Sequence, residues 1–514
     1  MITVSGKKAD LASPATKAAL LAIAPRLAAK DHTLWGVAAE EEAKVRLNWI
    51  DLPTSSRALL PELDALTAWS RSRGITTIVL AGMGGSSLAP EVIAKTYNKT
   101  LTVLDTTDPD QISAAIPADL AHSLVVVGSK SGSTIETASH KAFFTKLYHE
   151  AGLNPADHFV IVTDPGSPLD KSSRGDGLRV INADPNVGGR YSALSAFGLV
   201  PAALIGVDVS ILIDDAAAAA ATFALPGSAA IEIAAVLFDA SEQSVAFFDS
   251  GSALPGISDW IEQLIAESTG KNETGRLPIV IESEVAAIAG PGLRIGFHDD
   301  AKADLIVTGS LGEQFILWEW VTAFLGFSLK VDPFNQPNVT EAKERTGALL
   351  STWSDGRIPK LKASFENEVL SVYSISKANS LANQLTDFLK NDSHYFAIMA
   401  YLARGVDNDA LQVRELVAEK TGRGTTFGWG PRFLHSTGQF HKGGQHNGAF
   451  LQITGENSAD LSIPNQSFSF HTLLMAQALG DGQALSDRKF PLMRIHLKDR
   501  TSGLVFLLTE LKKL

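Results

Sequence analysis

Short apolar runs that end in small polar residues, each followed by a helical pattern, constrain the fold of this chain more than any other feature. The clearest runs are Ile75–Leu80, Leu124–Val127 and Phe159–Val162. Strands that alternate with helices predict a mostly parallel sheet with helices on both faces. Because ligands of such sheets bind at the carboxyl ends of the strands, the residues that follow each run are the first candidates for a functional site.

The same plan returns further along the chain, near residue 201 and again after residue 350. Asp214 and Asp215, followed by a run of alanines, predict the capped start of a helix in the second block. Further strands are predicted at Ser244–Phe248, Leu277–Ile281, Leu305–Val307, Tyr395–Leu402, Thr425–Trp429 and Leu492–Leu497. We therefore expect an α/β protein with a helical N-terminal segment at 1–60, sheet domains at 61–205 and 206–350, and a C-terminal α/β domain at 351–514.

The composition agrees with a packed globular protein and excludes several classes of function. The chain has 514 residues, 45% hydrophobic and 19% charged, a length that predicts three or four domains. It has no cysteine, which excludes a disulfide framework, a Cys-ligated metal site and a thiol nucleophile. A net charge of −12 argues against general nucleic-acid binding, which needs a basic surface.

Neither the N-terminus nor any internal stretch predicts an association with membranes. No apolar run approaches the roughly 18–20 residues of a spanning helix. The apolar stretch Ala18–Ala24 is followed by Pro25 and Arg26 and lacks the cleavage site of a secretory signal. We expect a cytoplasmic protein with neither a membrane nor a nucleic acid as partner.

Ala81–Pro90 is a glycine-rich turn between a predicted strand and a predicted helix. Glycines allow a ligand to approach the backbone closely, and the N–H groups at a helix start favour an anion. A tight turn without a ligand explains the same residues equally well, since short glycine motifs are frequent. This segment alone therefore leaves both interpretations open.

A stronger signal lies at the end of the next strand, in the segment Ser129–Thr137. Four hydroxyl side chains, a lysine and a glycine occur within the first six residues of that segment. The hydroxyl and backbone N–H groups can donate hydrogen bonds to a phosphate, and the lysine adds one positive charge. A capping loop is the alternative, but a cap needs one hydroxyl residue and not four, so phosphate binding is favoured.

Two charged residues further along the chain, Arg190 and Glu267, suggest a catalytic role only when they are considered together. Arg190 follows two glycines and can reach a substrate oxyanion, although a structural ion pair is equally possible. Glu267 stands where an apolar helix gives way to Ser-Thr-Gly, so a half-buried carboxylate can serve as a base. A surface glutamate near a helix end is the simpler explanation of Glu267 alone.

Histidines gather among glycines in the segment 427–446. His435, His441 and His446 have spacings that match zinc sites poorly and lack a nearby carboxylate. Proton transfer, or a hydrogen bond within a loop, fits these residues better than metal binding.

Taken together, these segments resemble the glucose-6-phosphate isomerase family. The segments that carry the resemblance occur in the family's order and cover roughly residues 60–345. They are Gly82-Met-Gly-Gly-Ser86, Ser129-Lys-Ser-Gly-Ser-Thr134 with Glu136-Thr137, Gly188-Gly-Arg-Tyr-Ser192, Glu267-Ser-Thr-Gly-Lys271 and Phe334-Asn-Gln-Pro-Asn-Val-Thr-Glu-Ala-Lys343. The resemblance implies two sugar-isomerase (SIS) domains, each a parallel sheet flanked by helices, and a homodimer.

The resemblance implies a role for each residue of this chain that matches a motif of the family. Arg190 would stabilise the enediolate, Glu267 would move the proton between C2 and C1, and Lys343 would assist ring opening. The remaining substrate ligands implied are Gly85 and Ser86 at the sugar, Ser129, Lys130, Ser131 and Thr134 at the phosphate, and Gln336 in the pocket. The substrate would be a sugar phosphate, and the reaction needs neither a metal nor another cofactor.

One part of the family pattern is missing. Most members have a Gly-Gln-His whose histidine helps to open the sugar ring, but this chain has Gln314 at that position. The segment 427–454 resembles the extension of isomerases that form the second half of transaldolase fusions. We expect His441 to take the ring-opening role, with His435 and His446 as alternatives.

The sequence thus predicts a glucose-6-phosphate isomerase and leaves rival functions to be tested. The nearest rival is a dual phosphoglucose/phosphomannose isomerase. A sugar-phosphate-binding SIS protein without turnover is disfavoured, because such a protein needs no base such as Glu267. An aminosugar-forming enzyme is disfavoured further, because it requires a glutamine-hydrolysing domain with a nucleophilic cysteine.

Overall fold

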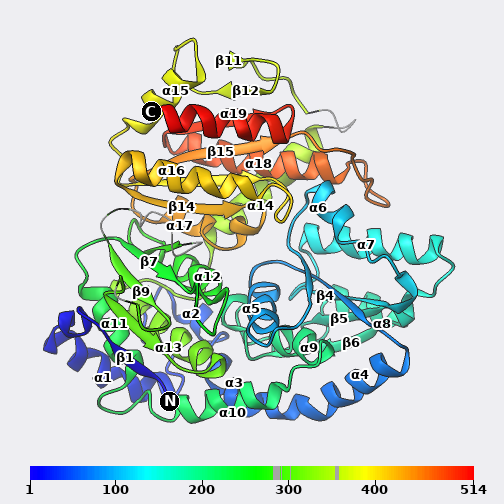
Figure 1. Ribbon diagram of the computed structural model, residues 1–514. Helices are drawn as coiled ribbons and strands as arrows, with labels where there is room; N and C mark the ends of the chain where they lie inside the picture. The colour runs from blue at the N-terminus through cyan, green and yellow to red at the C-terminus, as the bar shows by residue number, and fades with distance from the viewer. Residues whose placement is uncertain (282–289, 291, 301, 354–357) are drawn as a thin grey trace.

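The computed structural model describes residues 1–281, 290, 292–300, 302–353 and 358–514. Three sheets, each from a different part of the chain, form its framework. The first two lie side by side, and the third lies above both of them in Figure 1. The expected class, an α/β fold with parallel sheets flanked by helices, is confirmed.

The first sheet has the strand order β3-β2-β4-β5-β6, and all its neighbouring strands are parallel. The strands are β2 (Thr77–Gly82), β3 (Thr102–Leu104), β4 (Ser123–Gly128), β5 (Phe159–Thr163) and β6 (Arg179–Asn182). Its helices are α4 (Leu60–Ser72), α5 (Leu88–Thr96), α6 (Pro109–Ala114), α7 (Ile135–Glu150), α8 (Pro168–Gly175) and α9 (Ala196–Leu204). Val126 of β4 packs into one hydrophobic cluster and Val125 and Val127 into another, which is the pattern of a sheet covered on both faces.

The second sheet has the order β1-β10-β9-β7-β8, and only its edge strand β1 (Thr3–Ser5) is antiparallel to its neighbour. The other strands are β7 (Ser244–Phe248), β8 (Leu277–Val280), β9 (Leu293–Gly296) and β10 (Leu305–Thr308). Its helices are α10 (Val209–Ala220), α11 (Ala229–Asp239), α12 (Ile257–Thr269) and α13 (Leu311–Leu329), with α1 (Pro14–Ala28), α2 (Glu40–Ala43) and α3 (Leu52–Ser55) from the N-terminal segment.

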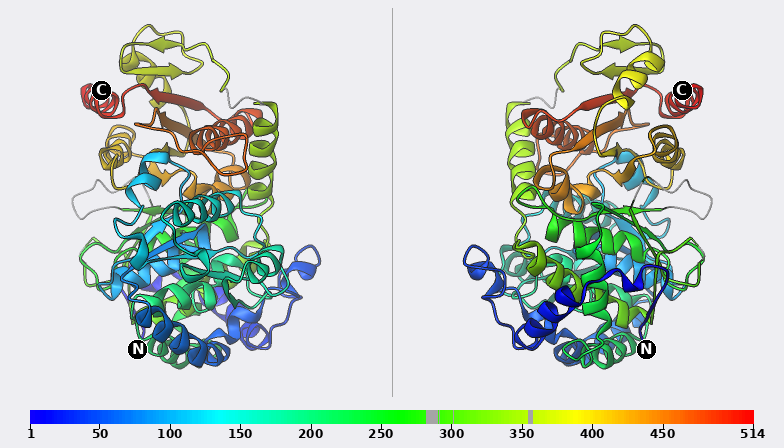
Figure 2. Two further views of the ribbon diagram at one scale, coloured as in Figure 1. Left: turned by 90° about the vertical axis from the view of Figure 1, so that its right-hand side faces the viewer. Right: turned by 90° about the vertical axis from the view of Figure 1, so that its left-hand side faces the viewer.

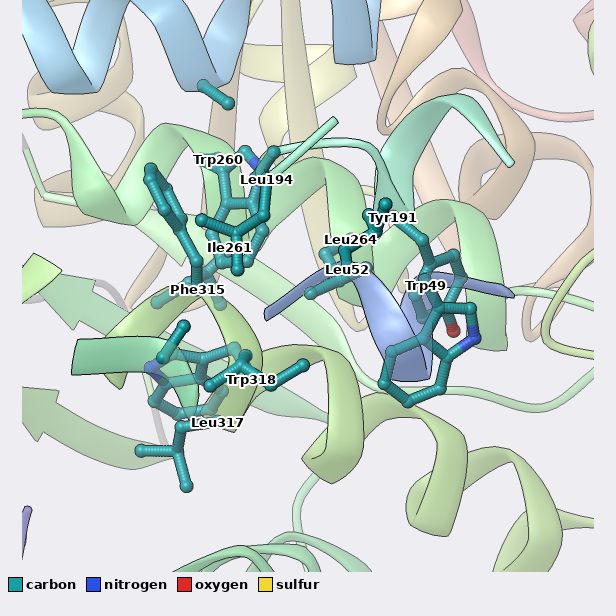
Figure 3. Close-up of a cluster of buried hydrophobic side chains, with 14 of the residues drawn as sticks. Trp49, Leu52, Tyr191, Leu194, Trp260, Ile261, Leu264, Phe315, Leu317 and Trp318 are labelled. Carbon is teal, nitrogen blue, oxygen red and sulfur yellow. The ribbon is translucent and has the colours of Figure 1, made fainter. Parts of the chain in front are cut away.

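Helices α12 and α13 form the centre of this second domain. Residues 311–326 of α13 are all buried, and the ring centroids of Trp260 on α12 and Phe315 on α13 lie 4.8 Å apart. Figure 3 shows Ile261 and Leu264 of α12 in the same cluster as Trp318. Because α12 is buried nearly along its whole length, the Glu267 side chain near its end has a fixed position.

The third sheet has the order β11-β12-β16-β15-β13-β14, with parallel strands from β16 to β14 and an antiparallel edge. The strands are β11 (Phe365–Glu366), β12 (Leu370–Tyr373), β13 (Tyr395–Tyr401), β14 (Gly424–Trp429), β15 (Gly448–Gly455) and β16 (Leu492–Leu497). Its helices are α14 (Pro337–Thr352), α15 (Leu381–Leu389), α16 (Leu411–Thr421), α17 (Gly438–Gly443), α18 (Phe470–Asp487) and α19 (Arg500–Lys513).

Buried ion pairs join the first domain to the C-terminal domain. Glu91 of α5 binds Arg432 and Arg404 through N–O distances of 2.7 Å each. Asp105, after β3, lies 3.0 Å from the same Arg432 guanidinium. These contacts fix the segment around residue 432 against the carboxyl ends of the first sheet. Helix α14 runs along one side of the molecule from the lower domains to the upper one (Figure 2).

Three predictions about single elements differ from the structure. Helix α10 begins at Val209, because the Asp208 side chain accepts a hydrogen bond from the Ser210 N–H, so Asp214 and Asp215 lie within the helix and do not cap it. The predicted helical N-terminal segment also contributes the edge strand β1. Strand β15 was not predicted, since its apolar residues directly follow the histidine- and glycine-rich segment.

Candidate active site

The glycine-rich turn after β2 packs against the loop that carries Arg190. A Cβ atom on Gly85 would lie 1.9 Å from the Gly189 carbonyl oxygen, so only glycine allows the two backbones to meet. Gly85 is buried in this contact, and Ser86 beside it is half-buried. The glycines at 84 and 85 thus position two loops of the cleft. This is a structural reason for the motif that the sequence alone did not provide.

The segment after β4 folds into a compact loop of hydroxyl side chains. The Ser129 hydroxyl accepts a hydrogen bond from the Gly132 N–H (3.1 Å) and donates one to Thr134 Oγ1 (3.3 Å). The hydroxyls of Ser131 and Ser133 lie 2.7 Å apart. Thr134 stands at the N-cap of α7, yet its side chain makes no capping hydrogen bond. The capping alternative therefore fails, and the helix start remains suited to an anion.

Lys130 does not direct its charge into this loop. Its ammonium group donates to the carbonyls of Pro185 (2.7 Å) and Val187 (3.0 Å) and lies 2.9 Å from Asp164 Oδ2. Burial lowers the pKa of Lys130 more than Asp164 raises it. In the structure this ammonium holds the loop before Arg190, and the role of Lys130 at the phosphate stays a prediction.

Arg190 and Glu267 meet in a buried cluster between the two sheet domains. Arg190 Nη1 lies 3.4 Å from Glu267 Oε1, and both side chains are less than a tenth exposed. The guanidinium also donates to Ser268 Oγ (2.7 Å) and to Gln336 Oε1 (2.9 Å). The structure therefore brings together three predicted site residues that lie far apart in the sequence. The carbonyls of Pro333 and Asn335 accept further bonds from Nη2.

Lys271, the last residue of the Glu267 motif, adds a second cation to this cluster. Its ammonium group donates to the Asp332 carbonyl. Burial and the neighbouring Arg190 hold the pKa of Lys271 well below its usual value. The motif quoted in the sequence contained this residue, but its spacing gave no sign that the ammonium would turn back toward Arg190.

The three candidate histidines occupy very different environments. The His441 ring is buried beside Tyr395, Phe433 and Phe450, and neither ring nitrogen has a hydrogen-bond partner among the described residues. Burial lowers the pKa of His441 to about 3. His441 is thus a histidine of the hydrophobic core, an environment that disfavours the predicted ring-opening role. His446 is exposed and stacks on Phe490, with ring centroids 4.0 Å apart.

His435 is the histidine that enters the cleft. Its Nε2 lies 3.1 Å from Glu136 Oε1, at the start of α7. Its backbone carbonyl accepts a hydrogen bond from Gln263 Nε2 (2.8 Å), and the same Gln263 amide donates to Glu267 Oε2 (3.0 Å). One side chain thus links the histidine segment to the candidate base. Gln314, which replaces the family's histidine, is buried and bonds Trp318 Nε1 at 2.9 Å.

Glu136 was quoted in the phosphate-loop motif but received no role from the sequence. It is buried, and its Oε1 also accepts a hydrogen bond from Gln477 Nε2 at 2.7 Å. Burial alone would raise the pKa of Glu136, but the hydrogen bond and charge of His435 bring it below the usual value. The Glu136 carboxylate thus holds the His435 ring in position.

Lys343 completes this side of the cleft. It projects from α14 into a cavity of about 170 Å³ that the phosphate loop, α14 and the C-terminal domain enclose together. Ser133, Glu136, His435 and Gln477 line the same cavity. The structure therefore groups Lys343 with His435, while Glu267 and Arg190 lie on the other side of Gln263.

The described parts of the chain show neither a metal-binding cluster nor a membrane-spanning helix. No group of three or more carboxylate or imidazole side chains there is arranged to hold a metal ion. No described helix has the length and apolar character needed to cross a membrane.

Comparison with known proteins identifies the segment that forms the two-domain cleft. The model of the phosphoglucose isomerase family matches residues 66–287. The glucose-6-phosphate isomerase of Thermus thermophilus is 31% identical over 236 residues, which make up 44% of this chain and 56% of that protein. That of Citrifermentans bemidjiense is 41% identical over 152 residues, 28% of this chain and 29% of that protein. The chain thus spans between 29% and 56% of the lengths of these two relatives.

A solved structure extends the likeness in fold. The glucose-6-phosphate isomerase of Chlamydia trachomatis aligns with 62% of this chain and 75% of its own, with a TM-score of 0.51 and 22% identity. The segment matched by the family model contains Ser129–Thr134, Arg190 and Glu267, whereas Lys343 and His435 lie outside it. The likeness to the phosphoglucose isomerase family thus covers residues 66–287, which include the Arg190–Glu267 pair.

Proposed function

We propose that this protein is a glucose-6-phosphate isomerase, which interconverts glucose 6-phosphate and fructose 6-phosphate through an enediolate. The observation that carries the proposal is the buried Glu267–Arg190 pair, 3.4 Å apart, inside the segment that the phosphoglucose isomerase family model matches. The relatives from Thermus thermophilus and Citrifermentans bemidjiense are named for the same activity.

The pair has the chemistry that an aldose–ketose isomerisation needs. The reaction removes a proton next to a carbonyl and returns it to the neighbouring carbon, so one carboxylate can act as base and then as acid. Glu267 fills this role. Negative charge develops on the enediolate oxygens, and the Arg190 guanidinium, held by several fixed partners, is preorganised to stabilise it.

The phosphate of the substrate would bind at the start of α7. Ser129, Ser131 and Thr134 supply hydroxyl donors, and the helix N-terminus supplies backbone N–H groups. Since Lys130 is engaged elsewhere, we assign the phosphate to neutral donors and the helix terminus rather than to this ammonium group. Binding energy from the phosphate would hold the reacting carbons beside Glu267.

We assign ring opening to His435 in place of His441. The His435 imidazole would donate a proton to the ring oxygen, and Glu136 Oε1, 3.1 Å from His435 Nε2, holds the ring in place. Lys343 lines the same cavity and would assist from α14. The C-terminal domain then has a defined function: it carries the histidine that the second domain lacks. No redox step occurs in this reaction, so no cofactor is required.

We further infer a cytoplasmic location and a homodimer from the resemblance. Every group assigned above comes from one chain, so a dimer would not be needed to complete the site. Activity per chain should therefore stay constant on dilution through the range in which the protein dissociates. A loss of activity that follows dissociation would contradict a site completed within one chain.

The test of the proposed function is turnover by the purified protein. Fructose 6-phosphate should yield glucose 6-phosphate, which a coupled glucose-6-phosphate dehydrogenase assay detects as reduced dinucleotide. Mannose 6-phosphate in the same assay, with fructose 6-phosphate formation measured, separates a single from a dual specificity. Binding of sugar phosphate by calorimetry without turnover would overturn the isomerase and leave the non-catalytic binding protein.

A further inference from the structure

A second cavity lies in the C-terminal domain, apart from the candidate active site. Its volume is about 610 Å³, within the roughly 300–1,000 Å³ range of small-molecule sites. Helices α14 and α18 and strands β12, β15 and β16 enclose it, and none of its lining residues lines the cavity around Lys343. The role proposed for this protein leaves the second cavity unused.

Strand pairing sets three polar side chains in a row on its floor. Arg494 of β16 pairs with Tyr373 of β12 on one side and with Gln452 of β15 on the other. Register partners point to the same face of a sheet, so the phenol, the guanidinium and the amide are neighbours. The Arg494 guanidinium carbon lies 4.2 Å from the centroid of the Tyr373 ring, which holds the guanidinium in place.

The charge of Arg494 is not neutralised within the described part of the chain. No described carboxylate lies within ion-pairing distance of this guanidinium, and its Nε, although buried, has no hydrogen-bond partner there. Burial lowers the pKa of Arg494. The other arginine of the wall, Arg345, differs because it binds Glu341 and Asp487. Arginines taken out of water are normally paired, so a partly buried guanidinium that faces a cavity fits an anionic ligand.

Two further features suit the cavity to an organic ligand rather than to a bare inorganic ion. Gln452 is only 1% exposed, and its Oε1 has no partner among the described residues, while its Nε2 donates to the Ala478 carbonyl. Gly482 of α18 packs next to that Oε1, since a Cβ on this glycine would lie 3.5 Å from it. The remaining wall is largely apolar and includes Leu349, Trp353, Leu479 and Leu492.

We propose that this cavity is a binding site for a small organic anion with an apolar or aromatic body, whose carboxylate or phosphate binds Arg494. The body would pack between α14 and α18, and Gln452 Oε1 would accept a hydrogen bond from the ligand. The Arg494 guanidinium is already held against the Tyr373 ring, so it can bind a carboxylate or phosphate with little further loss of side-chain entropy.

The probe for this site is 8-anilinonaphthalene-1-sulfonate, an aromatic anion that fluoresces in apolar surroundings. Its neutral relative N-phenyl-1-naphthylamine measures how well the cavity binds an aromatic body that carries no charge. Arg494→Met should weaken binding of the anion about tenfold or more and leave the neutral probe unchanged. Ala348→Trp, which fills the cavity from an exposed position on α14, should abolish binding of both probes there.

Arg179→Met is the matched control, since Arg179 lies over Trp69 at 4.0 Å in the same kind of stack in the first domain. It should change neither isotherm. Benzoate and phenyl phosphate then compete for the probe site, and the stronger competitor identifies the preferred anionic group. Circular dichroism and thermal unfolding verify that each variant is folded.

Three results would overturn the proposal. The first is that the wild-type protein does not bind the anionic probe. The second is that folded Arg494→Met and Ala348→Trp variants bind the probe as tightly as the wild type. The third is that neither benzoate nor phenyl phosphate displaces the probe. Loss of the neutral probe in Arg494→Met to the same extent as the anion would also contradict a site that selects for charge.

Discussion

The two sides of the candidate active site were assembled in different ways. The Glu267–Arg190 pair lies between the two sheet domains, inside the segment matched by the family model. The His435–Glu136 pair joins the first domain to the C-terminal domain, and His435 lies outside that segment. The first pair can be found from local motifs, whereas the second requires a segment 299 residues away in sequence to fold onto α7.

The same contrast separates two histidines of one segment, His435 and His441. The side chain of His435 is 13% exposed and reaches a buried carboxylate, while the His441 ring packs among aromatic rings without a polar partner. Their sequence surroundings are similar, with glycines and an aromatic residue nearby. Proximity in sequence therefore does not assign a chemical role, because the two side chains contact different parts of the molecule.

The largest expected effect is on the side that the motifs define. Glu267→Gln should reduce kcat by about 10²- to 10⁴-fold, the usual contribution of a general base, because the amide cannot accept the C2 proton. Steady-state kinetics with fructose 6-phosphate measure this. The Gln263–Glu267 contact can persist in the variant, so thermal unfolding should change little. Full activity in this variant would remove Glu267 from the mechanism and with it the proposed chemistry.

The next effect tests the side that the tertiary structure defines. His435→Ala should lower kcat by about 10²-fold, at the lower end for an acid–base group, because the C-terminal domain would no longer supply a proton donor for ring opening. His446→Ala is the matched control and should keep full activity, since its ring stacks on Phe490 at the surface. A larger loss of kcat in a folded His441→Leu variant than in His435→Ala would reverse our assignment.

His441 should instead affect stability, and in a pH-dependent way. Its pKa is about 3 in the folded protein, against 6.5 for the unperturbed group, so the unfolded chain takes up a proton first as the pH falls. The folded state is therefore favoured fully above about pH 6.5 and loses stability down to about pH 3. At pH 5 this amounts to about 2 kcal/mol.

His441→Leu removes that dependence while it keeps an apolar side chain in the core. Urea unfolding at pH 7 and pH 5 should show a smaller loss of unfolding free energy in the variant than in the wild type. An equal loss in both proteins would mean that the His441 ring gains a polar partner or water in solution.

The smallest effect concerns Lys130. Lys130→Met should leave KM for the sugar phosphate within about threefold of the wild type and should lower unfolding free energy by about 1–3 kcal/mol, because Asp164 loses its partner in a partly buried site. Ser129→Ala, in contrast, should raise KM without a comparable loss of stability. A tenfold or greater rise of KM in Lys130→Met, without a loss of stability, would show that the Lys130 ammonium group binds the substrate phosphate after all.

Much of the fold followed from the sequence. Leu124–Val127 is apolar and buried at every position, as expected for a strand covered on both faces of a parallel sheet. Leu492–Leu497 instead alternates between buried apolar residues and the partly buried Arg494 and His496, which is the period-two pattern of a strand. Strand β15 escaped prediction since a glycine-rich segment directly precedes it. The start of α10 was misplaced, because several acidic residues nearby can cap a helix and only the backbone decides which one does.

The sequence by itself predicted which residues form the cleft: Ser129, Ser131, Thr134, Arg190 and Glu267 each belong to a short motif at a strand or helix end. Only the tertiary structure decided that Lys130 turns away from the phosphate loop, that His435 enters the cleft and that Arg494 faces a cavity without a carboxylate. These outcomes depend on which distant groups reach each charge, and electrostatic partners are set by distance in space and burial rather than by position along the chain.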